Sequence, residues 1–252
     1  MKSEHVLTFN SIMGKQKFTY TAGLVNTCPF CERSALTDIL DEDGPILLVK
    51  NKFQVIEDAY QTVLIETDSC DAEFSTYSKE HLHRLFHFAF IHWLSLEKCG
   101  RYASVILFKN HGPLSGGSIA HAHMQIIGFN KLDYRHNISP EQFGGHIIDQ
   151  NCGVELNISD HPRVGFSEFN VVLKNLDKLD IMADYLQICI HYLLNHFRQC
   201  QSYNIFFYHL EDVFFAKVIP RFITSPIYIG YSIPQVTDRV EQIVSEIKQK
   251  YF

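Results

Sequence analysis

Apolar and polar positions along the chain form short blocks that predict strands and longer blocks that predict helices. Ser78 opens and Gly100 closes a long segment with a helical apolar period. Short apolar runs bounded by polar or turn residues predict strands in the first half over 46–50, 53–57, 62–67, 102–109 and 121–129. Residues 1–27 are polar and lack a helical period, and residues 130–163 are rich in Asn, Gly, Pro and Asp, which is typical of a connector.

The second half repeats this plan. The predicted elements are strands over 169–174, 203–209 and 213–219, and helices over 178–201 and 234–249. The strings YASVILFKN at 102–110 and YNIFFYHLE at 203–211 have the same alternation, each after a long helix. The pattern therefore predicts an α+β protein built from a duplicated strand–helix–strand–strand unit.

Composition narrows the class of protein. Of the 252 residues, 46% are hydrophobic and 20% charged, which is typical of a folded chain. The formal charge of −6 gives no basic excess for duplex nucleic acid, and no apolar run reaches the ~18 residues of a membrane span. The seven cysteines and the absence of a signal peptide at the N-terminus predict a cytoplasmic protein with reduced thiols.

A polar motif lies in the first half, where Asn110 opens a Gly/Ser-rich loop before the strand over 121–129. His121, His123 and Gln125 are spaced by two, so on a strand they project to one face. The small loop residues offer backbone N–H groups and hydroxyls to phosphate oxygens: Ser115, Gly116, Gly117 and Ser118. An imidazole beside such a loop can act as a nucleophile or general base. The alternative interpretation is an edge strand with exposed histidines after a flexible loop.

A second motif is Cys28-Pro-Phe-Cys31. Two cysteines at this spacing can bind one zinc ion and form half of a tetrahedral site, although a redox pair is the alternative. The candidates for the other ligands are His121, Cys70, and the pair His83 and His87 at i, i+4 on the long helix. The helical pair is surrounded by apolar residues and is more typical of structural histidines.

The region over 25–130 resembles the galactose-1-phosphate uridylyltransferases and their relatives in the histidine-triad superfamily. The family's Asn, Gly/Ser loop and His-x-His-x-Gln are matched by Asn110, Gly116, Ser118, His121, His123 and Gln125. Upstream elements are matched by Cys28 and Cys31, by Asn51-Lys-Phe53, and by Glu66 to Cys70. Residues 220–231 resemble the family's second repeat more weakly. Gln125 stands where triad hydrolases carry a third histidine, which indicates the transferase and phosphorylase branch.

The resemblance implies a role for each matched residue. His123 would be the nucleophile that attacks the α-phosphorus of a nucleoside diphosphate compound, and Gln125 would hydrogen-bond the phosphoryl oxygen. The phosphates would be held by Ser118, the loop glycines and Asn110, with Asn51 near the sugar or base. Cys28, Cys31 and His121 would ligate one structural zinc ion. The family places a histidine at the fourth ligand, where this chain has Cys70, with Asp71 or Glu73 as alternatives.

The resemblance also implies the organisation of the chain. Residues 1–135 would form a catalytic histidine-triad-like repeat with the zinc site, and residues 136–252 a degenerate second repeat. Each repeat would be an antiparallel sheet with a long helix. The second repeat lacks the histidines, with Val213 to Lys217 in their place, and it lacks the histidine pair that holds a further metal in some transferases.

The expected function is therefore that of a nucleotidyltransferase or phosphorylase. Its substrate would be a nucleoside diphosphate sugar or a dinucleotide, processed through a nucleotidyl-histidine intermediate. The alternatives are a nucleotide hydrolase of the same superfamily and a non-catalytic nucleotide-binding protein. The expected partner is a small-molecule nucleotide, with no duplex nucleic acid and no membrane, for a chain that is a monomer or a homodimer.

Overall fold

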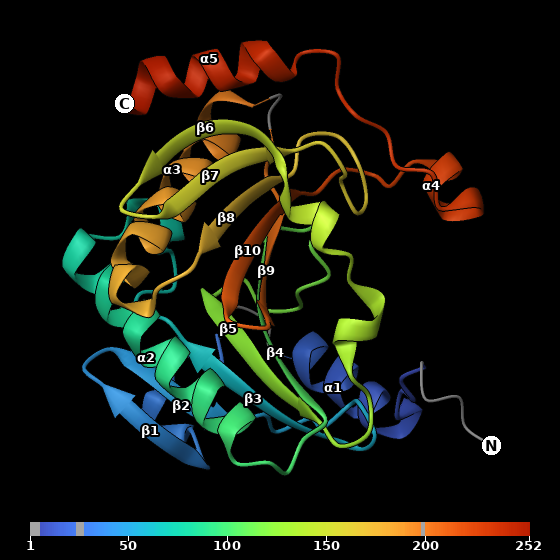
Figure 1. Ribbon diagram of the computed structural model, residues 1–252. Coiled ribbons are helices and arrows are strands. Elements are labelled where there is room, and N and C mark those ends of the chain that lie inside the picture. Colours follow the sequence, from blue (N-terminus) through green and yellow to red (C-terminus); the bar gives the residue numbers. More distant parts are fainter. Residues whose placement is uncertain (1–5, 24–27, 198–199) are drawn as a thin grey trace. The chain divides into compact units, whose positions relative to one another are not determined.

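The computed structural model describes residues 6–23, 28–197 and 200–252, and it divides into two compact units (Figure 1). Unit 1 comprises Met1–Glu73, His87–Lys109 and Ser118–His136. Unit 2 comprises Phe74–Phe86, Asn110–Gly117 and Asn137–Phe252. Each unit thus combines segments that are distant in sequence.

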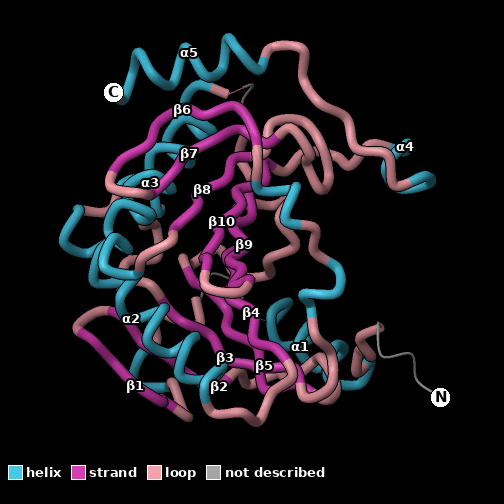
Figure 2. The backbone as a smooth tube through the Cα atoms, in the orientation of Figure 1, coloured by secondary structure: helices cyan, strands magenta, loops and turns pink. Residues whose placement is uncertain are grey.

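Unit 1 is built on antiparallel strands in the order β1-β2-β3-β5-β4 (Figure 2). Their bounds are β1 Ile39–Asp43, β2 Ile46–Lys50, β3 Ala59–Ile65, β4 Ser104–His111 and β5 His123–Phe129. The helix α2, Lys79–Lys98, places its second half in this unit, where the indole N–H of Trp93 donates to the Val105 carbonyl at 3.0 Å. The interior strands are buried on both faces, which explains their continuous apolar runs.

Unit 2 has antiparallel strands in the order β9-β10-β8-β7-β6. Their bounds are β6 Gly145–Asn151, β7 Val154–Ser159, β8 Phe169–Leu173, β9 Tyr203–Leu210 and β10 Val213–Pro220. The helix α3, Leu179–His196, packs its apolar residues against β8, β10 and β7. The C-terminal helix α5, Val240–Tyr251, contacts β6 and buries Ile243 and Ile247.

The two strand orders confirm the predicted duplication. In chain order β3, α2, β4, β5 the strands pair as β3-β5-β4, and in chain order β8, α3, β9, β10 they pair as β8-β10-β9. In both copies the last strand lies between the first two and pairs antiparallel with each. The predicted α+β class with two antiparallel repeats is therefore correct, while the boundary between residues 135 and 136 stays a prediction.

Several predicted boundaries are wrong. Residues 53–57 form no strand, because the Gln54 side chain bonds the backbone of Asn51 and Gln61 and the segment makes one bridge, between Phe9 and Ile56. The stretch over 130–163, expected to be a connector, holds β6 and β7. Most side chains of β6 are exposed at the edge of the sheet, so its sequence lacks an apolar run, whereas the short β7 is largely buried. The helix expected to start at 234 begins at Val240, and the helix expected to reach 201 ends at His196, with residues 198–199 outside those described.

Other elements had no apolar signal. The helix α1, Ser11–Gly23, shows no buried side chain over its described positions, and the fully exposed β1 likewise lacks an apolar face. The short helix α4 is Pro226–Tyr231, begun by Ser225, whose side chain accepts the Ile227 N–H. None of the described helices is both long and apolar enough to span a membrane.

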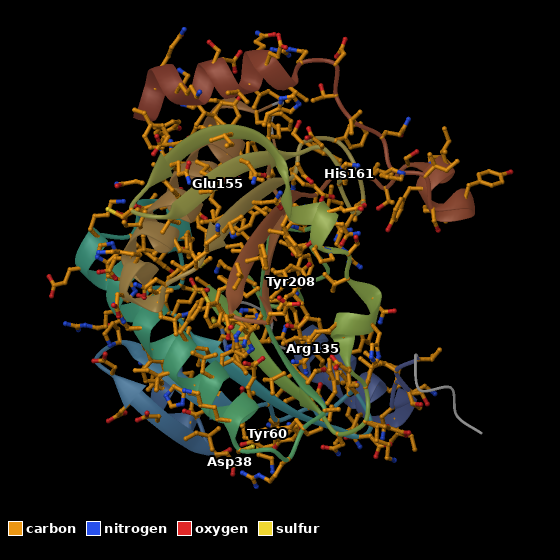
Figure 3. The ribbon with its side chains drawn as sticks, in the orientation of Figure 1. Asp38, Tyr60, Arg135, Glu155, His161 and Tyr208 are labelled. Carbon is orange, nitrogen blue, oxygen red and sulfur yellow. The ribbon has the colours of Figure 1, made fainter. Side chains whose placement is uncertain are left out.

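The end of β5 remote from its histidines is set by a close ring contact. A Cβ at Gly128 would lie 2.7 Å from the ring of Tyr102, and that ring stacks on Tyr60 at 6.2 Å between centroids. Tyr60 is labelled in Figure 3. A side chain at position 128 would therefore displace the Tyr102 ring.

Candidate functional site

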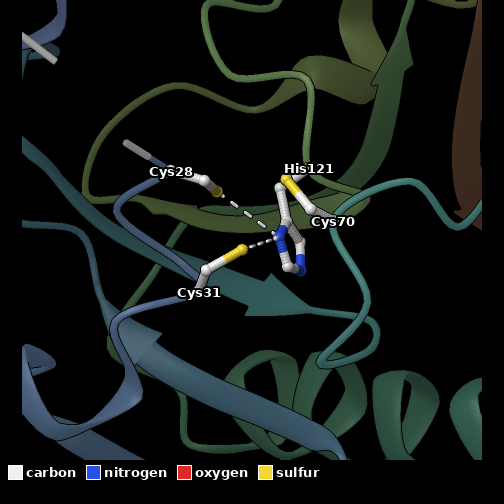
Figure 4. Close-up of side chains that lie close together, drawn as sticks. All are labelled: Cys28, Cys31, Cys70 and His121. Carbon is white, nitrogen blue, oxygen red and sulfur yellow. Dashed lines mark hydrogen bonds between the residues drawn. The ribbon is translucent and has the colours of Figure 1, made fainter. Parts of the chain in front are cut away.

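Three cysteines and one histidine converge in unit 1. The ligand atoms of Cys28, Cys31, Cys70 and His121 all lie within 4.8 Å of one another (Figure 4). Cys28 and Cys31 flank a turn closed by the Cys31 N–H donating to the Cys28 carbonyl at 3.1 Å. Cys70 follows β3 and His121 precedes β5, so the pairing of these two strands brings distant sequence positions together.

The hydrogen bonds of His121 fix its tautomer. Nε2 lies 2.8 Å from the Thr67 carbonyl oxygen, which only accepts, so Nε2 carries the hydrogen. Nδ1 therefore has a free lone pair, and it lies 3.4 Å from Cys28 Sγ and 3.6 Å from Cys31 Sγ. This is the arrangement of a metal-binding histidine, with one nitrogen as ligand and the other bonded to a carbonyl.

The four side chains fit zinc. Tetrahedral bonds of about 2.3 Å to sulfur and about 2.0 Å to nitrogen separate those two ligand atoms by about 3.5 Å, close to the distances found. Burial and the neighbouring thiols raise the pKa of Cys70 to about 12, so the thiol must lose its proton on metal binding. Cys70 is the cysteine expected at the fourth position; the alternatives Asp71 and Glu73 lie outside this group.

His123 has the opposite tautomer. Its Nδ1 lies 2.7 Å from the carbonyl oxygen of His121, so Nδ1 carries the hydrogen and Nε2 of the neutral ring holds the lone pair. The side chain is 7% exposed, and burial lowers the pKa of His123, which keeps the ring neutral. The ring of Phe30 packs edge-on against both imidazole rings, with ring centroids 5.8 Å apart for His121 and 5.4 Å apart for His123. Both histidines thus lie on one side of the strand, as their spacing predicts.

A buried ion pair supports the same strand. Lys109 on β4 donates to the Glu66 carboxylate at 2.5 Å, and both side chains are at most 1% exposed. The backbone N–H of Glu66 donates to the carbonyl of Ala122, between the two histidines, and Thr67 accepts from His121. The only sign of this pair in the sequence is a Lys within a largely apolar strand, which does not identify its partner.

The other predicted residues of unit 1 lie around this strand in varied surroundings. Gln125 is half-buried on β5, with Val63 and Phe108 as its partners on the flanking strands. Ser118 is exposed. Asn51 is half-buried, and its side-chain oxygen accepts the Phe53 N–H at 3.0 Å.

The loop residues Asn110, Ser115, Gly116 and Gly117 belong to unit 2. Gly116 has φ +85°, and a Cβ at Gly117 would lie 3.3 Å from the Cβ of Asn110. The side chain of Asn204 on β9 donates to Asn110 Oδ1 at 2.6 Å and to the Ser115 carbonyl at 3.0 Å. No motif in the sequence marks Asn204, because its role arises only from its position beside the loop.

The histidine pair on α2 is not part of the group of possible metal ligands. His83 Nε2 lies 2.8 Å from the Asp184 carboxylate on α3, which also accepts from Lys79 at 2.7 Å. His83 thus links α2 to α3, and neither His83 nor His87 belongs to the group of possible metal ligands.

Comparison with solved structures defines the class of fold. A "galt-like protein" from Arabidopsis thaliana aligns with TM-score 0.71 at 14% identity, covering 88% of this chain and 91% of that one. The Arabidopsis thaliana ADP-glucose phosphorylase with bound ADP-glucose aligns with TM-score 0.73 at 12% identity, covering 88% and 89%. The chain has the fold of these uridylyltransferase-like proteins, as the sequence motifs predict.

The family is more specific. Family profiles described as the N-terminal and C-terminal domains of a domain of unknown function, DUF4931, match residues 9–132 and 135–252. The chain belongs to this family. A crystal structure of a DUF4931 family protein from Bacillus cereus ATCC 10987 is 46% identical with TM-score 0.78, covering 84% of this chain and 98% of that one.

A curated protein matches a short part of the chain. The Di-/tripeptide transporter of Lactobacillus helveticus is 46% identical over 52 residues, which are 21% of this chain and 10% of that protein. The chain thus matches only a tenth of that relative's length.

Proposed function

We propose that this protein is a zinc-containing nucleotidyltransferase or phosphorylase that acts through a nucleotidyl-His123 intermediate. One observation carries the proposal: the ring of His123 is buried and neutral, and its Nδ1 donates to the His121 carbonyl, so the nucleophilic lone pair is fixed on Nε2. A merely structural histidine has no need of that arrangement beside a His-x-His-x-Gln motif.

In the first step, Nε2 of His123 attacks the α-phosphorus of a nucleoside diphosphate sugar or a dinucleotide. A phosphorus–nitrogen bond forms and the bond from phosphorus to the bridging oxygen breaks, with the electron pair leaving on a sugar phosphate or a nucleotide. In the second step an oxygen of the acceptor, phosphate or a sugar phosphate, attacks the same phosphorus and restores Nε2. The substrate is a small molecule, and the residues require no duplex nucleic acid or membrane.

Other residues of the sequence motif would share the binding of the substrate. Gln125 would donate its amide N–H to the phosphoryl oxygen, while Ser118 and the loop glycines would hold the phosphates. Asn110 would also position the phosphates, and Asn51 would lie near the sugar or base. These roles rest on the motif that the sequence matches.

We also propose that Cys28, Cys31, Cys70 and His121 hold one structural zinc ion. Bound zinc supplies rigidity, fixing a histidine two residues from the nucleophile. All seven cysteines are free thiols, and three of them serve this cluster, which fits a protein that works in the reducing cytoplasm. The oligomeric state, monomer or homodimer, stays a prediction.

Covalent labelling tests the function. The protein is incubated with a panel of α-³²P-labelled nucleoside diphosphate sugars and dinucleotides, denatured at alkaline pH, and analysed for retained label. Wild type should retain label from at least one substrate, and the H123N variant should retain none. A wild type that labels with no substrate, while folded and metal-loaded, would overturn the covalent mechanism.

The acceptor is identified with the labelled enzyme. Adding inorganic phosphate or a sugar phosphate should release the label as a nucleoside diphosphate or a new nucleotide sugar. Release as the monophosphate at the same rate without any acceptor would identify a hydrolase instead.

A further inference from the structure

The second repeat carries a chain of hydrogen bonds that ends at the phosphate loop. Arg221, just after β10, donates from Nη1 to Asn204 Oδ1 at 2.8 Å. Asn204 in turn donates from Nδ2 to Asn110 Oδ1 at 2.6 Å and to the Ser115 carbonyl at 3.0 Å. All four residues belong to unit 2, so the whole chain of contacts lies within one compact body.

The direction of this chain is determined at its first member. A guanidinium has donors and no acceptor, so the atom of Asn204 that faces Arg221 must be the amide oxygen. The amide nitrogen of Asn204 then faces the loop, and the atom of Asn110 that meets it must be its oxygen. The Nδ2 group of Asn110 is left over as a donor, and it has no hydrogen-bond partner among the described residues.

Phosphate oxygens accept hydrogen bonds and do not donate them. An asparagine that presented its oxygen to a phosphate would repel it, whereas one that presents its N–H₂ group binds it. An isolated Asn is free to rotate its amide by 180°, which exchanges the two groups. Asn110 is not free to do so, because Asn204 donates to its oxygen.

The backbone of the loop is held against the same residues. Arg221 donates its backbone N–H to the Ser202 carbonyl at 2.7 Å, and the Ser202 hydroxyl accepts the Leu114 N–H at 3.1 Å. Gly112 has φ +81°, and a Cβ there would lie 2.1 Å from the Gln201 carbonyl oxygen. The loop therefore packs against residues 201–202, just before β9.

We propose that Arg221 is a positioning residue of the substrate site: through Asn204 it orients the amide of Asn110 so that its N–H₂ group faces a phosphate of a nucleoside diphosphate. The inference rests on the proposed function. It assigns the second repeat, which lacks the histidines, a part in substrate binding. Arg221 acts through Asn110 and need not touch the substrate.

A double-mutant cycle tests the proposal. Affinities for ADP, UDP, GDP and CDP, and for the matching nucleosides, are measured by calorimetry on wild type, R221M, N110L and the double variant. R221M and N110L should each weaken diphosphate binding about tenfold, the effect of about one hydrogen bond to a charged group, and leave nucleoside binding unchanged. The double variant should also lose about tenfold, because Arg221 acts through Asn110.

A hundredfold loss in the double variant would mean that Arg221 acts on the phosphate independently, and the proposal would be wrong. It would also be wrong if R221M bound diphosphates as tightly as wild type. R221K, which keeps a donor without an acceptor, should restore most of the affinity. R239M removes an arginine that pairs with Glu246 in the same unit and serves as the matched control.

The outcome can be separated from the proposed function. Coupled losses in a protein whose His123 takes no label would leave the positioning role intact and remove the covalent mechanism. If His123 is labelled but the affinity losses of R221M and N110L add up in the double variant, the covalent mechanism stands and the positioning role of Arg221 is wrong. A wild type that binds none of the four diphosphates, while its thermal unfolding shows a folded protein, would overturn both.

Discussion

Among the described residues, each unit contains one fully buried lysine–glutamate pair, and the two pairs have different surroundings. In unit 1, Lys109 meets Glu66, whose backbone holds the segment between the two histidines. In unit 2, Lys217 on β10 lies 3.2 Å from Glu168, whose carboxylate also accepts the backbone N–H groups of Arg163, Val164 and Gly165. The first pair adjoins candidate chemistry, and the second closes a loop.

The two repeats differ in the contacts that surround the buried ion pair. A buried ion pair loses hydration on both sides and is tolerated where additional hydrogen bonds satisfy its atoms. In unit 2 those bonds come from a loop, and burial, opposed by Glu168, lowers the pKa of Lys217. In unit 1 the pair lies beside the strand ends that carry His123 and two of the proposed zinc ligands, Cys70 and His121. The second repeat has the same strand order as the first, and its buried ion pair stabilises a loop.

The largest expected effect is the loss of activity on replacing His123 of β5, compared with replacing a histidine on a strand of the second repeat. H123N should lower activity and covalent labelling at least about 1,000-fold, because loss of a nucleophile removes the intermediate. His209 on β9, which stacks on Phe214, is the matched histidine of unit 2. H209N should leave labelling within about twofold, measured on the same substrate; equal losses would mean that the two repeats are not specialised.

Replacing the lysine of either buried ion pair should lower the stability of the protein by a similar amount. K109M and K217M each remove the lysine that pairs with a buried carboxylate, so each should lower the free energy of unfolding by about 3–5 kcal/mol in urea titrations. The second substitutions K109M/E66M and K217M/E168M also remove the buried carboxylate. K217M/E168M should recover only part of the loss, because three loop N–H groups lose their acceptor.

The same double variants test whether the ion pair of unit 1 contributes to the reactivity of His123. K109M/E66M should lower labelling of His123 more than K217M/E168M does, at a temperature where both are folded. Equal labelling would show that the pair in unit 1 is a packing feature only.

Metal removal should act on unit 1. Wild type should contain one zinc per chain by elemental analysis, and C28S should contain much less. With metal at about a thousandfold over its Kd, binding stabilises the folded state by about 4 kcal/mol, so chelation should lower the melting temperature. The exposed Cys99 lies outside the cluster, and C99S should keep the metal. A metal-free protein that folds and melts like wild type would contradict the assignment.

The smallest effect belongs to the exposed ion pairs. D184N removes the partner of Lys79 and His83 between α2 and α3, where the side chains are 28–55% exposed. It should cost less than about 1 kcal/mol in the free energy of unfolding, because solvent screens such pairs. A loss equal to that of K109M would show that exposure does not distinguish these contacts.

Apolar periodicity located the elements that build the interior. The strands β2, β3, β4, β5, β8, β9 and β10 and the helices α2 and α3 all have buried faces, and their sequences show them. The elements β1, β6 and α1 lie at exposed positions, where burial selects no pattern. Periodicity therefore predicted most of the interior. It failed at these exposed elements, and the expected connector also hid β7, whose side chains are largely buried.

By itself the sequence determined the alternation of His121, His123 and Gln125, the Cys28 and Cys31 spacing, and the duplicated strand plan, because these depend on residues near one another in the chain. Tertiary structure decided the rest. Strand pairing brought Cys70 to the cluster and Lys109 to Glu66, and the second repeat placed Arg221 and Asn204 beside the loop. Backbone carbonyls then fixed which nitrogen of each histidine is free, since a tautomer depends on the partner that folding supplies.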